Sequence, residues 1–213
     1  MALQQSRAFV VAAGMCAAAL LTHAAQRDLF DEIYLRGQPI AGDLKTLTAR
    51  FTESSTSSLL AKPLVAQGTL AVLRPSTMIL RYTDPERRTV LIEGDVMRVI
   101  WPARAIDRRT AIGTAQRRIQ QYFVDKSPSQ LRSHFDITAR VADDRAGTWR
   151  IAMTPRRQQV KQGLAALELW LDREALLLAA MRMTFPNGDT KLMEFADVTV
   201  NPPIDPSVFR VTP

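Results

Sequence analysis

Cysteine and histidine are almost absent from this chain of 213 residues. There is one cysteine, Cys16, and there are two histidines, of which only His134 lies outside the first 25 residues. A zinc site built on His134 would need carboxylates around it, and no Asp or Glu has the spacing of a ligand set. The sequence therefore predicts no metal, no cofactor and no disulfide.

Patterns typical of catalysis are missing as well. A Ser-His-Asp arrangement would have to use His134, and no nucleophile-elbow glycine pattern occurs in the chain. No glycine-rich phosphate loop is present either. Asp143 and Asp144 precede Gly147 as residues of a turn do, rather than as an acid–base pair. We read His134 as an ordinary surface or helix-end residue and predict that the protein is not an enzyme.

Long apolar runs occur only near the N-terminus. A single positive charge, Arg7, precedes an uncharged stretch over residues 8–21, and small residues follow. This is the pattern of a secretory signal peptide, and the stretch is shorter than the roughly 20 apolar residues that span a bilayer core. A buried N-terminal helix would instead show polar residues at helical spacing. We expect residues 1–25 to be a signal peptide without a lipid anchor, because Met15 before Cys16 does not fit a lipoprotein cleavage box.

The exported part of the chain carries a moderate excess of positive charge. The net charge of +7 becomes +6 once the single charge of Arg7 is removed with the signal peptide. No basic run interleaved with aromatic residues is present, so nucleic acid is not an expected partner. The excess suits anionic lipid headgroups or an acidic protein, or serves solubility alone. The same choice between a binding surface and a solvated face applies to Arg104, Arg108, Arg109, Arg117 and Arg118.

Most of the remaining chain has the two-residue period of β-strands. About nine strand candidates follow from Leu47 onwards, each with one apolar side and bounded by Gly, Pro, Asp or Asn. The connections are short, as in antiparallel hairpins, and Asn187-Gly188 is the strongest hairpin signal. The expected fold class is therefore mainly β with an antiparallel sheet, α+β in broad terms. Residues 26–213 have a suitable length for a single domain.

Three segments show helical spacing instead. Residues 28–36 place four apolar side chains on one face, and Gly37 with Pro39 is expected to end this helix. A helical insertion into the sheet is predicted over residues 112–124, where glutamines and arginines lie opposite the apolar side. A shorter helix should begin after Ser127, a favourable N-cap residue, and turn two apolar side chains inwards.

Methionine is the conspicuous residue of the predicted strands. Six methionines lie on strand candidates, five of them on a consistently apolar face. Methionine is flexible and polarizable, which suits a surface that accepts varied apolar shapes, although plain core filling is the alternative. A sheet of this size has few helices to cover it, so a cavity for an apolar ligand can remain. The six are Met78, Met97, Met153, Met181, Met183 and Met193.

A series of short motifs runs along nearly the whole exported chain. They are Phe51-Thr-Glu53, Gly68-Thr-Leu-Ala-Val-Leu-Arg-Pro75, Tyr82-Thr-Asp-Pro85, Leu91-Ile-Glu-Gly94, Trp101-Pro102, Met153-Thr-Pro155, Leu171-Asp172 and Asn201-Pro-Pro-Ile-Asp-Pro-Ser-Val-Phe209. In order and spacing this series resembles the LolA family, periplasmic carriers that shuttle lipoproteins from the inner to the outer membrane of Gram-negative bacteria. Residues 103–146 show no family motif and are compatible only with a helical lid.

The resemblance implies an open antiparallel β-barrel, or half-barrel, with a helical lid and acyl chains entering between the two. The family's functional arginine corresponds to Arg74, which in the family bonds lid carbonyls and lets go when cargo enters. An inward Arg74 beside Leu70 and Val72 would need such acceptors, whereas a strand-end arginine facing water is the alternative. Met78 and Leu80 stand where the family often has aromatic residues, which leaves the cargo open.

The same resemblance implies the partners and the location. We expect a periplasmic monomer that takes acylated lipoprotein, or other lipid cargo, from an inner-membrane transporter and passes it to an outer-membrane acceptor. The alternatives are a carrier of another lipid or lipid-like product for an exporter, and a lipid-sensing regulatory module. The residues predicted to line the apolar cavity are Leu70, Val72, Met78, Leu80, Met97, Val99, Trp101, Ile119, Phe123, Met181, Met183 and Phe185.

Overall fold

A computed structural model describes residues 28–111 and 127–211. Within them, eleven strands form one open sheet in the order β6-β5-β4-β3-β2-β1-β11-β10-β9-β8-β7, with every neighbouring pair antiparallel. The predicted fold class, mainly β, is confirmed, with eleven strands rather than about nine. They are β1 (Thr46–Thr56), β2 (Leu64–Leu73), β3 (Thr77–Asp84), β4 (Arg88–Glu93), β5 (Val96–Trp101), β6 (Ile106–Ala111), β7 (Phe135–Val141), β8 (Thr148–Pro155), β9 (Ala166–Asp172), β10 (Leu178–Thr184) and β11 (Thr190–Val200).

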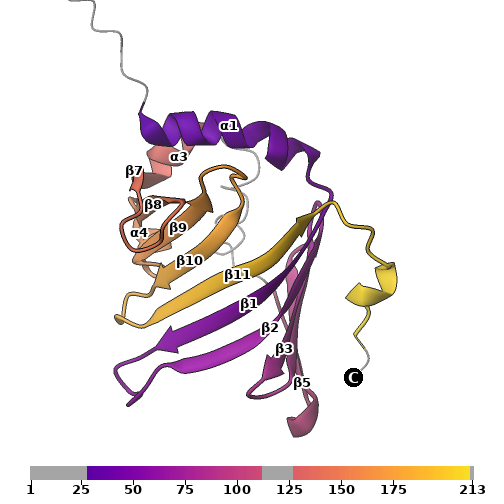
Figure 1. Cartoon of the computed structure of the whole chain (residues 1–213). Helices are drawn as coiled ribbons and strands as arrows, with labels where there is room; N and C mark the ends of the chain where they lie inside the picture. Colours follow the sequence, from indigo (N-terminus) through magenta and orange to yellow (C-terminus); the bar gives the residue numbers. More distant parts are fainter. Residues whose placement is uncertain (1–27, 112–126, 212–213) are drawn as a thin grey trace, which may run out of the picture.

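The sheet curves, and its inner face is the one that packs against helix α1 (Leu29–Asp43) (Figure 1). Side chains that stand opposite one another on neighbouring strands share a face, so the register identifies the inner residues. One row of this face crosses β2, β3, β4 and β5 and consists of Leu70, Leu80, Val90 and Val99. This row makes the inner face apolar across β2, β3, β4 and β5.

Helix α1 lies across one end of the sheet and is longer than its sequence suggests (Figure 1). Asp28 caps it by accepting a hydrogen bond from the backbone N–H of Phe30 at 2.9 Å. The prediction that Gly37 and Pro39 end the helix was wrong, because it continues to Asp43. Tertiary hydrogen bonds to its last turn compensate for the poor helix formers there. We call residues 29–36 the anchored half and residues 37–43 the roof half.

The short helix expected after Ser127 is confirmed as α3 (Pro128–His134). Ser127 and Gln130 form a reciprocal capping box. The two side chains expected to point inwards are Leu131 and Phe135, and both are buried, Phe135 as the first residue of β7. His134 ends the helix and is half-buried. The predicted signal peptide and the predicted helix over residues 112–124 lie outside the described residues.

The outer face is covered in part by the C-terminal segment. Phe209, in the short helix η2 (Pro206–Phe209), packs against Ile79 and Leu91 of the sheet. The guanidinium of Arg81 donates a 2.8 Å hydrogen bond to the carbonyl of Val208 and so ties the segment down. The remaining short helices are η1 (Pro102–Arg104) and α4 (Gln158–Lys161).

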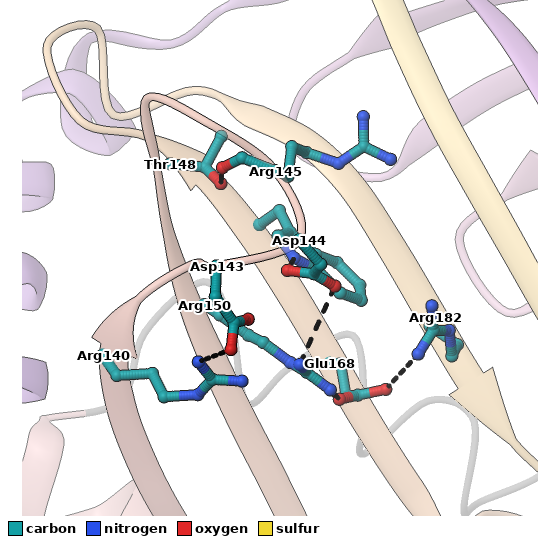
Figure 2. Close-up of polar contacts among 9 residues, drawn as sticks. Arg140, Asp143, Asp144, Arg145, Thr148, Arg150, Glu168 and Arg182 are labelled. Carbon is teal, nitrogen blue, oxygen red and sulfur yellow. Dashed lines mark hydrogen bonds and ion pairs between the residues drawn. The ribbon is translucent and has the colours of Figure 1, made fainter.

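A polar cluster joins β8, β9 and β10 on the outer face (Figure 2). Glu168 pairs with the guanidinium groups of Arg150 and Arg182, which lie 5.3 and 5.1 Å from the ring centre of the buried Trp170. The indole N–H of Trp170 donates a 3.0 Å hydrogen bond to Asp144, a residue of the predicted turn. Each charged group named here has a partner within the cluster. These contacts hold the three strands together, so a structural role accounts for the cluster.

Candidate functional site

A cavity of about 590 Å³ lies beneath α1, within the range of about 300–1,000 Å³ that is usual for small-molecule sites. Its walls come from the inner face of β8 and β9 and from α3, and its roof comes from α1. The lining residues are Phe30, Ile33, Tyr34, Gly37, Gln38, Ala41, Gly42, Arg74, Ser127, Leu131, Ile151, Met153, Leu169, Leu171 and Leu176. Arg74 is the one charged side chain among them, so the lining suits an apolar chain.

Arg74 stands at the rim of this cavity, one residue beyond the end of β2. Its guanidinium donates a 2.8 Å hydrogen bond to the backbone carbonyl of Ala41 in the last turn of α1. Carbonyls in the last helical turn lack a partner within the helix, and a positive charge there is favourable. The last turn of α1 has no basic residue of its own. Arg74, which comes from the sheet, therefore provides the positive charge that the last turn of α1 lacks.

The roof half of α1 is intrinsically a weak helix. Gly37 and Gly42 each cost roughly 0.5–1 kcal/mol relative to alanine, and Pro39 cannot donate a backbone hydrogen bond. Its described ties to the sheet side are the bond from Arg74 and a 3.0 Å hydrogen bond from the Asn201 side chain to the carbonyl of Asp43. Among the described residues, the roof half is thus held less firmly than the anchored half, which buries Phe30 and Ile33.

The opposite end of the inner face carries a buried charge cluster. Glu53 of β1 accepts a 2.6 Å hydrogen bond from the hydroxyl of Tyr82 and pairs with Lys191 at 3.0 Å and Arg88 at 3.4 Å. Burial raises the pKa of the Glu53 carboxyl, but the Tyr82 hydrogen bond and the Lys191 charge outweigh it and hold that pKa below its ordinary value. Burial and Glu53 raise the pKa of Tyr82 to about 12. The carboxylate is thus kept charged within an apolar face.

The predicted cavity residues divide into three groups. Nine lie on the inner face by strand register: Leu70, Val72, Met78, Leu80, Met97, Val99, Trp101, Met181 and Met183. Phe185 follows β10 in the turn before β11 and is half-buried. Ile119 and Phe123 lie outside the described residues. Of the predicted site, Arg74 is the residue that lines the cavity under α1.

Sequence reasoning missed most of the cavity wall. Leu169 and Leu171 lie on the apolar side of β9, and Met153 is one of the six methionines predicted to lie on strands, yet none of the three was predicted to line the cavity. The signal that could have found the roof was the weak helical segment with Gly37 and Gly42 directly after a strongly amphipathic one. Such a segment has few apolar side chains to bury in a core, and its helix is of low local stability, as is common for segments that cover a binding site.

No group of three or more His, Cys, Asp or Glu side chains comes together as a metal site within residues 28–111 and 127–211. In the same described part of the chain, none of the helices is long and apolar enough to cross a membrane. The candidate site is thus defined by its apolar walls and its roof.

The fold and the cavity together define the class of this protein. Its members would have a strongly curved open sheet and an apolar cavity on the inner face that a helix covers. The chain matches the family model "Outer membrane lipoprotein carrier protein LolA" over residues 42–212. The protein belongs to the LolA family. No curated protein matches the sequence.

Solved structures share the fold at low sequence identity. An uncharacterized conserved protein from Thermus thermophilus has a TM-score of 0.55 and 8% identity over 85% of this chain and 93% of that chain. MucB has a TM-score of 0.52 and 18% identity over 86% of this chain and 63% of that chain. The complex of Pseudomonas aeruginosa MucA and MucB gives a TM-score of 0.50 and 17% identity, over 86% of this chain and 61% of that chain. This chain therefore spans less than two thirds of the length of MucB.

Proposed function

We propose that the protein is a periplasmic carrier that binds the acyl chains of lipoproteins in the cavity under α1 and shuttles them from the inner to the outer membrane. The observation that carries this proposal is the pairing of an apolar cavity with a weak helical roof tied by Arg74. In this proposal, residues 26–213 form one carrier domain after a signal peptide. The protein acts as a monomer, without a cofactor and without enzymatic activity.

The energetics favour opening by cargo. Each buried methylene contributes about 0.8 kcal/mol, and apolar area contributes roughly 25 cal/mol per Å². A single hydrogen bond such as the one from Arg74 to Ala41 contributes about 1 kcal/mol net. An acyl chain of several methylenes that enters the cavity therefore outweighs the bond that closes the roof. In this scheme, an inner-membrane transporter supplies the energy for loading, and an outer-membrane acceptor with higher affinity takes the cargo.

Native mass spectrometry of the protein purified from the periplasm of its own host, with lipid extraction, tests this proposal. Acylated lipoprotein, or its acylated peptide, is the expected ligand. Leu169→Trp should fill part of the cavity and reduce the bound fraction, whereas Leu192→Trp makes the same size change on the outer face and should leave it unchanged. A protein that is empty and also fails to take up added acyl chains would contradict the carrier function.

A second candidate keeps the cavity and changes the cargo. Besides Arg74, the lining offers few polar groups, among them Gln38 and Ser127, so it selects for an apolar chain more than for any headgroup. A different lipid in the mass spectrum would indicate a carrier that serves an exporter. A lipid-sensing regulatory module is the remaining alternative, since MucB of the same fold is found in a complex with MucA. Stable co-purification with one protein partner would favour it.

A further inference from the structure

The hairpin between β1 and β2 presents apolar side chains to solvent. Leu59 is 91% exposed, Leu64 60%, Val65 49% and Leu60 38%. Half of the large apolar side chains that are exposed in the described part of the chain lie within these few positions. Single exposed apolar residues are ordinary on protein surfaces, but a concentration of them marks an interaction site.

On its β2 side this hairpin also projects beyond β3, whereas β11 accompanies β1 as far as Thr56. β1 and β2 pair as far as Ser55 and Leu64, whereas β2 pairs with β3 only from Gln67 onwards. Residues 64–66 of β2 therefore extend past β3 by about 10 Å, at roughly 3.3 Å per residue. Figure 1 shows the hairpin at the ends of β1 and β2 that lie away from α1. The cavity and the hairpin tip thus occupy opposite ends of the sheet.

The turn at the tip is ordered by its own hydrogen bonds. The carbonyl of Ser57 accepts from the backbone N–H of Leu60 at 3.0 Å, and the hydroxyl of Ser57 accepts from the backbone N–H of Leu59 at 3.3 Å. The leucines are consequently displayed by a defined turn. Binding through them requires little additional ordering of the backbone.

The charge of the hairpin points to an anionic and partly apolar partner. From Ser54 to Gln67 there is no Asp or Glu, and the single charged side chain is the exposed Lys62. Serine and threonine hydroxyls flank the leucines on the β1 side. Exposed leucines with a single cation and several hydroxyls nearby in the sequence suit the boundary between the acyl chains and the anionic headgroups of a bilayer.

We propose that the β1–β2 hairpin docks the protein on anionic phospholipid bilayers, with Leu59 and Leu60 entering the acyl boundary and Lys62 at the phosphates. This membrane contact goes beyond the carrier function, because it does not involve the cavity. Since the two sites lie at opposite ends of the sheet, membrane docking and acyl-chain binding are separable by mutation.

Flotation with vesicles of phosphatidylethanolamine and phosphatidylglycerol tests the proposal, with neutral phosphatidylcholine vesicles for comparison. The wild-type protein should float with the anionic vesicles, and Leu59→Asp should lower the vesicle partition coefficient roughly tenfold or more, because one fully buried leucine accounts for at least that factor. Lys62→Glu should cause a smaller loss, and added salt should weaken wild-type binding. Val96→Asp is the matched control, since Val96 is exposed at the α1 end of the sheet.

Two results would overturn the proposal. One is wild-type protein that floats with neither kind of vesicle, and the other is Leu59→Asp that floats as well as the wild type. If Leu59→Asp in the second case also abolishes binding to a membrane protein, the hairpin is a protein-docking element instead. Uptake of a fluorescent fatty acid in solution, measured in parallel, should be the same for Leu59→Asp and the wild type. If neither protein takes up the fatty acid, the result counts against the carrier function and not against the membrane contact.

Discussion

The two halves of α1 are held to the protein in different ways. The anchored half buries Phe30 and Ile33 in the largest core cluster, and Arg132 pairs with Asp28 and Asp31 beside it. The roof half buries no large apolar side chain and depends on hydrogen bonds to two of its carbonyls. One helix therefore joins a firmly packed half to a half held by few described contacts, and the proposed carrier function requires such a difference.

The largest expected effect comes from the anchored half. Phe30→Ala should lower the free energy of unfolding by about 3–5 kcal/mol, because it opens a cavity among fully buried neighbours. Leu35→Ala, in the same half but 47% exposed, should change it by less than about 0.5 kcal/mol. Urea denaturation followed by circular dichroism measures both. Equal losses for the two variants would show that the anchored half is not packed as described.

A substitution at Glu53, at the far end of the inner face, distinguishes a loss of global stability from local opening of the roof half. Glu53→Gln should cost about 2 kcal/mol of unfolding free energy, because it removes the charge that Lys191 and Arg88 surround. It should not change hydrogen exchange in the roof half relative to the rest of the protein. Glu86→Gln is the control, since its partner Arg104 is exposed and Glu86 itself is only half-buried, so this pair should be worth under about 1 kcal/mol.

The same residue gives the pH dependence of stability. The pKa of Glu53 is lower in the folded protein than its ordinary value of 4.5, so its stabilising contribution is complete above that pH. The contribution is lost as the pH falls through the lower, folded-state pKa. Unfolding free energies measured from pH 7 down to pH 3 should fall less steeply for Glu53→Gln than for the wild type. A parallel dependence in both proteins would contradict this assignment.

Stiffening the roof should have an intermediate effect of opposite sign. A Cβ at Gly37 or Gly42 would meet no atom within 4 Å, so alanine fits at both positions. The double variant with alanine at both should raise the helical stability of the roof half by about 1–2 kcal/mol and slow the uptake of a fluorescent fatty acid. By contrast, Gly188→Ala should destabilise the β10–β11 hairpin, because its φ is +86°. Unchanged uptake in the double variant would show that the roof does not gate the cavity.

Removal of the Arg74 hydrogen bond to the roof half should change the free energy of unfolding least among these substitutions. Arg74→Leu should leave global stability within about 1 kcal/mol but raise hydrogen exchange across residues 37–43 several-fold, and it should impair the release of cargo. Arg81→Leu is a matched control that removes a guanidinium–carbonyl bond of the same 2.8 Å length on the outer face. Normal transfer of cargo by Arg74→Leu would exclude the role proposed for Arg74.

Local patterns predicted the sheet well because each strand's alternation is set by its own residues. The hairpin at Asn187-Gly188 and the capped helix after Ser127 were likewise readable from short-range chemistry. Gly68, part of the motif series, is explained by the structure, since a Cβ there would lie 2.2 Å from the carbonyl oxygen of Arg81. These features need no knowledge of distant contacts.

What the sequence left out depends on contacts between distant segments. The continuation of α1 past Pro39 relies on Arg74 and Asn201, which lie 33 and 158 residues from the carbonyls they bond. The cavity wall could not be located because every strand has an apolar side, and only the position of α1 decides which part of it stays uncovered. The buried Glu53 cluster was unpredictable for the same reason, as its partners come from three other strands.

Photo-crosslinking tests the central claim most directly, with an acylated peptide that carries a diazirine near the end of its acyl chain. We predict adducts on the roof half of α1 and on Ile151 and Leu169, and their loss in Leu169→Trp. Adducts confined to the outer face, or labelling that excess unlabelled acyl peptide does not reduce, would contradict a cavity under α1 as the binding site.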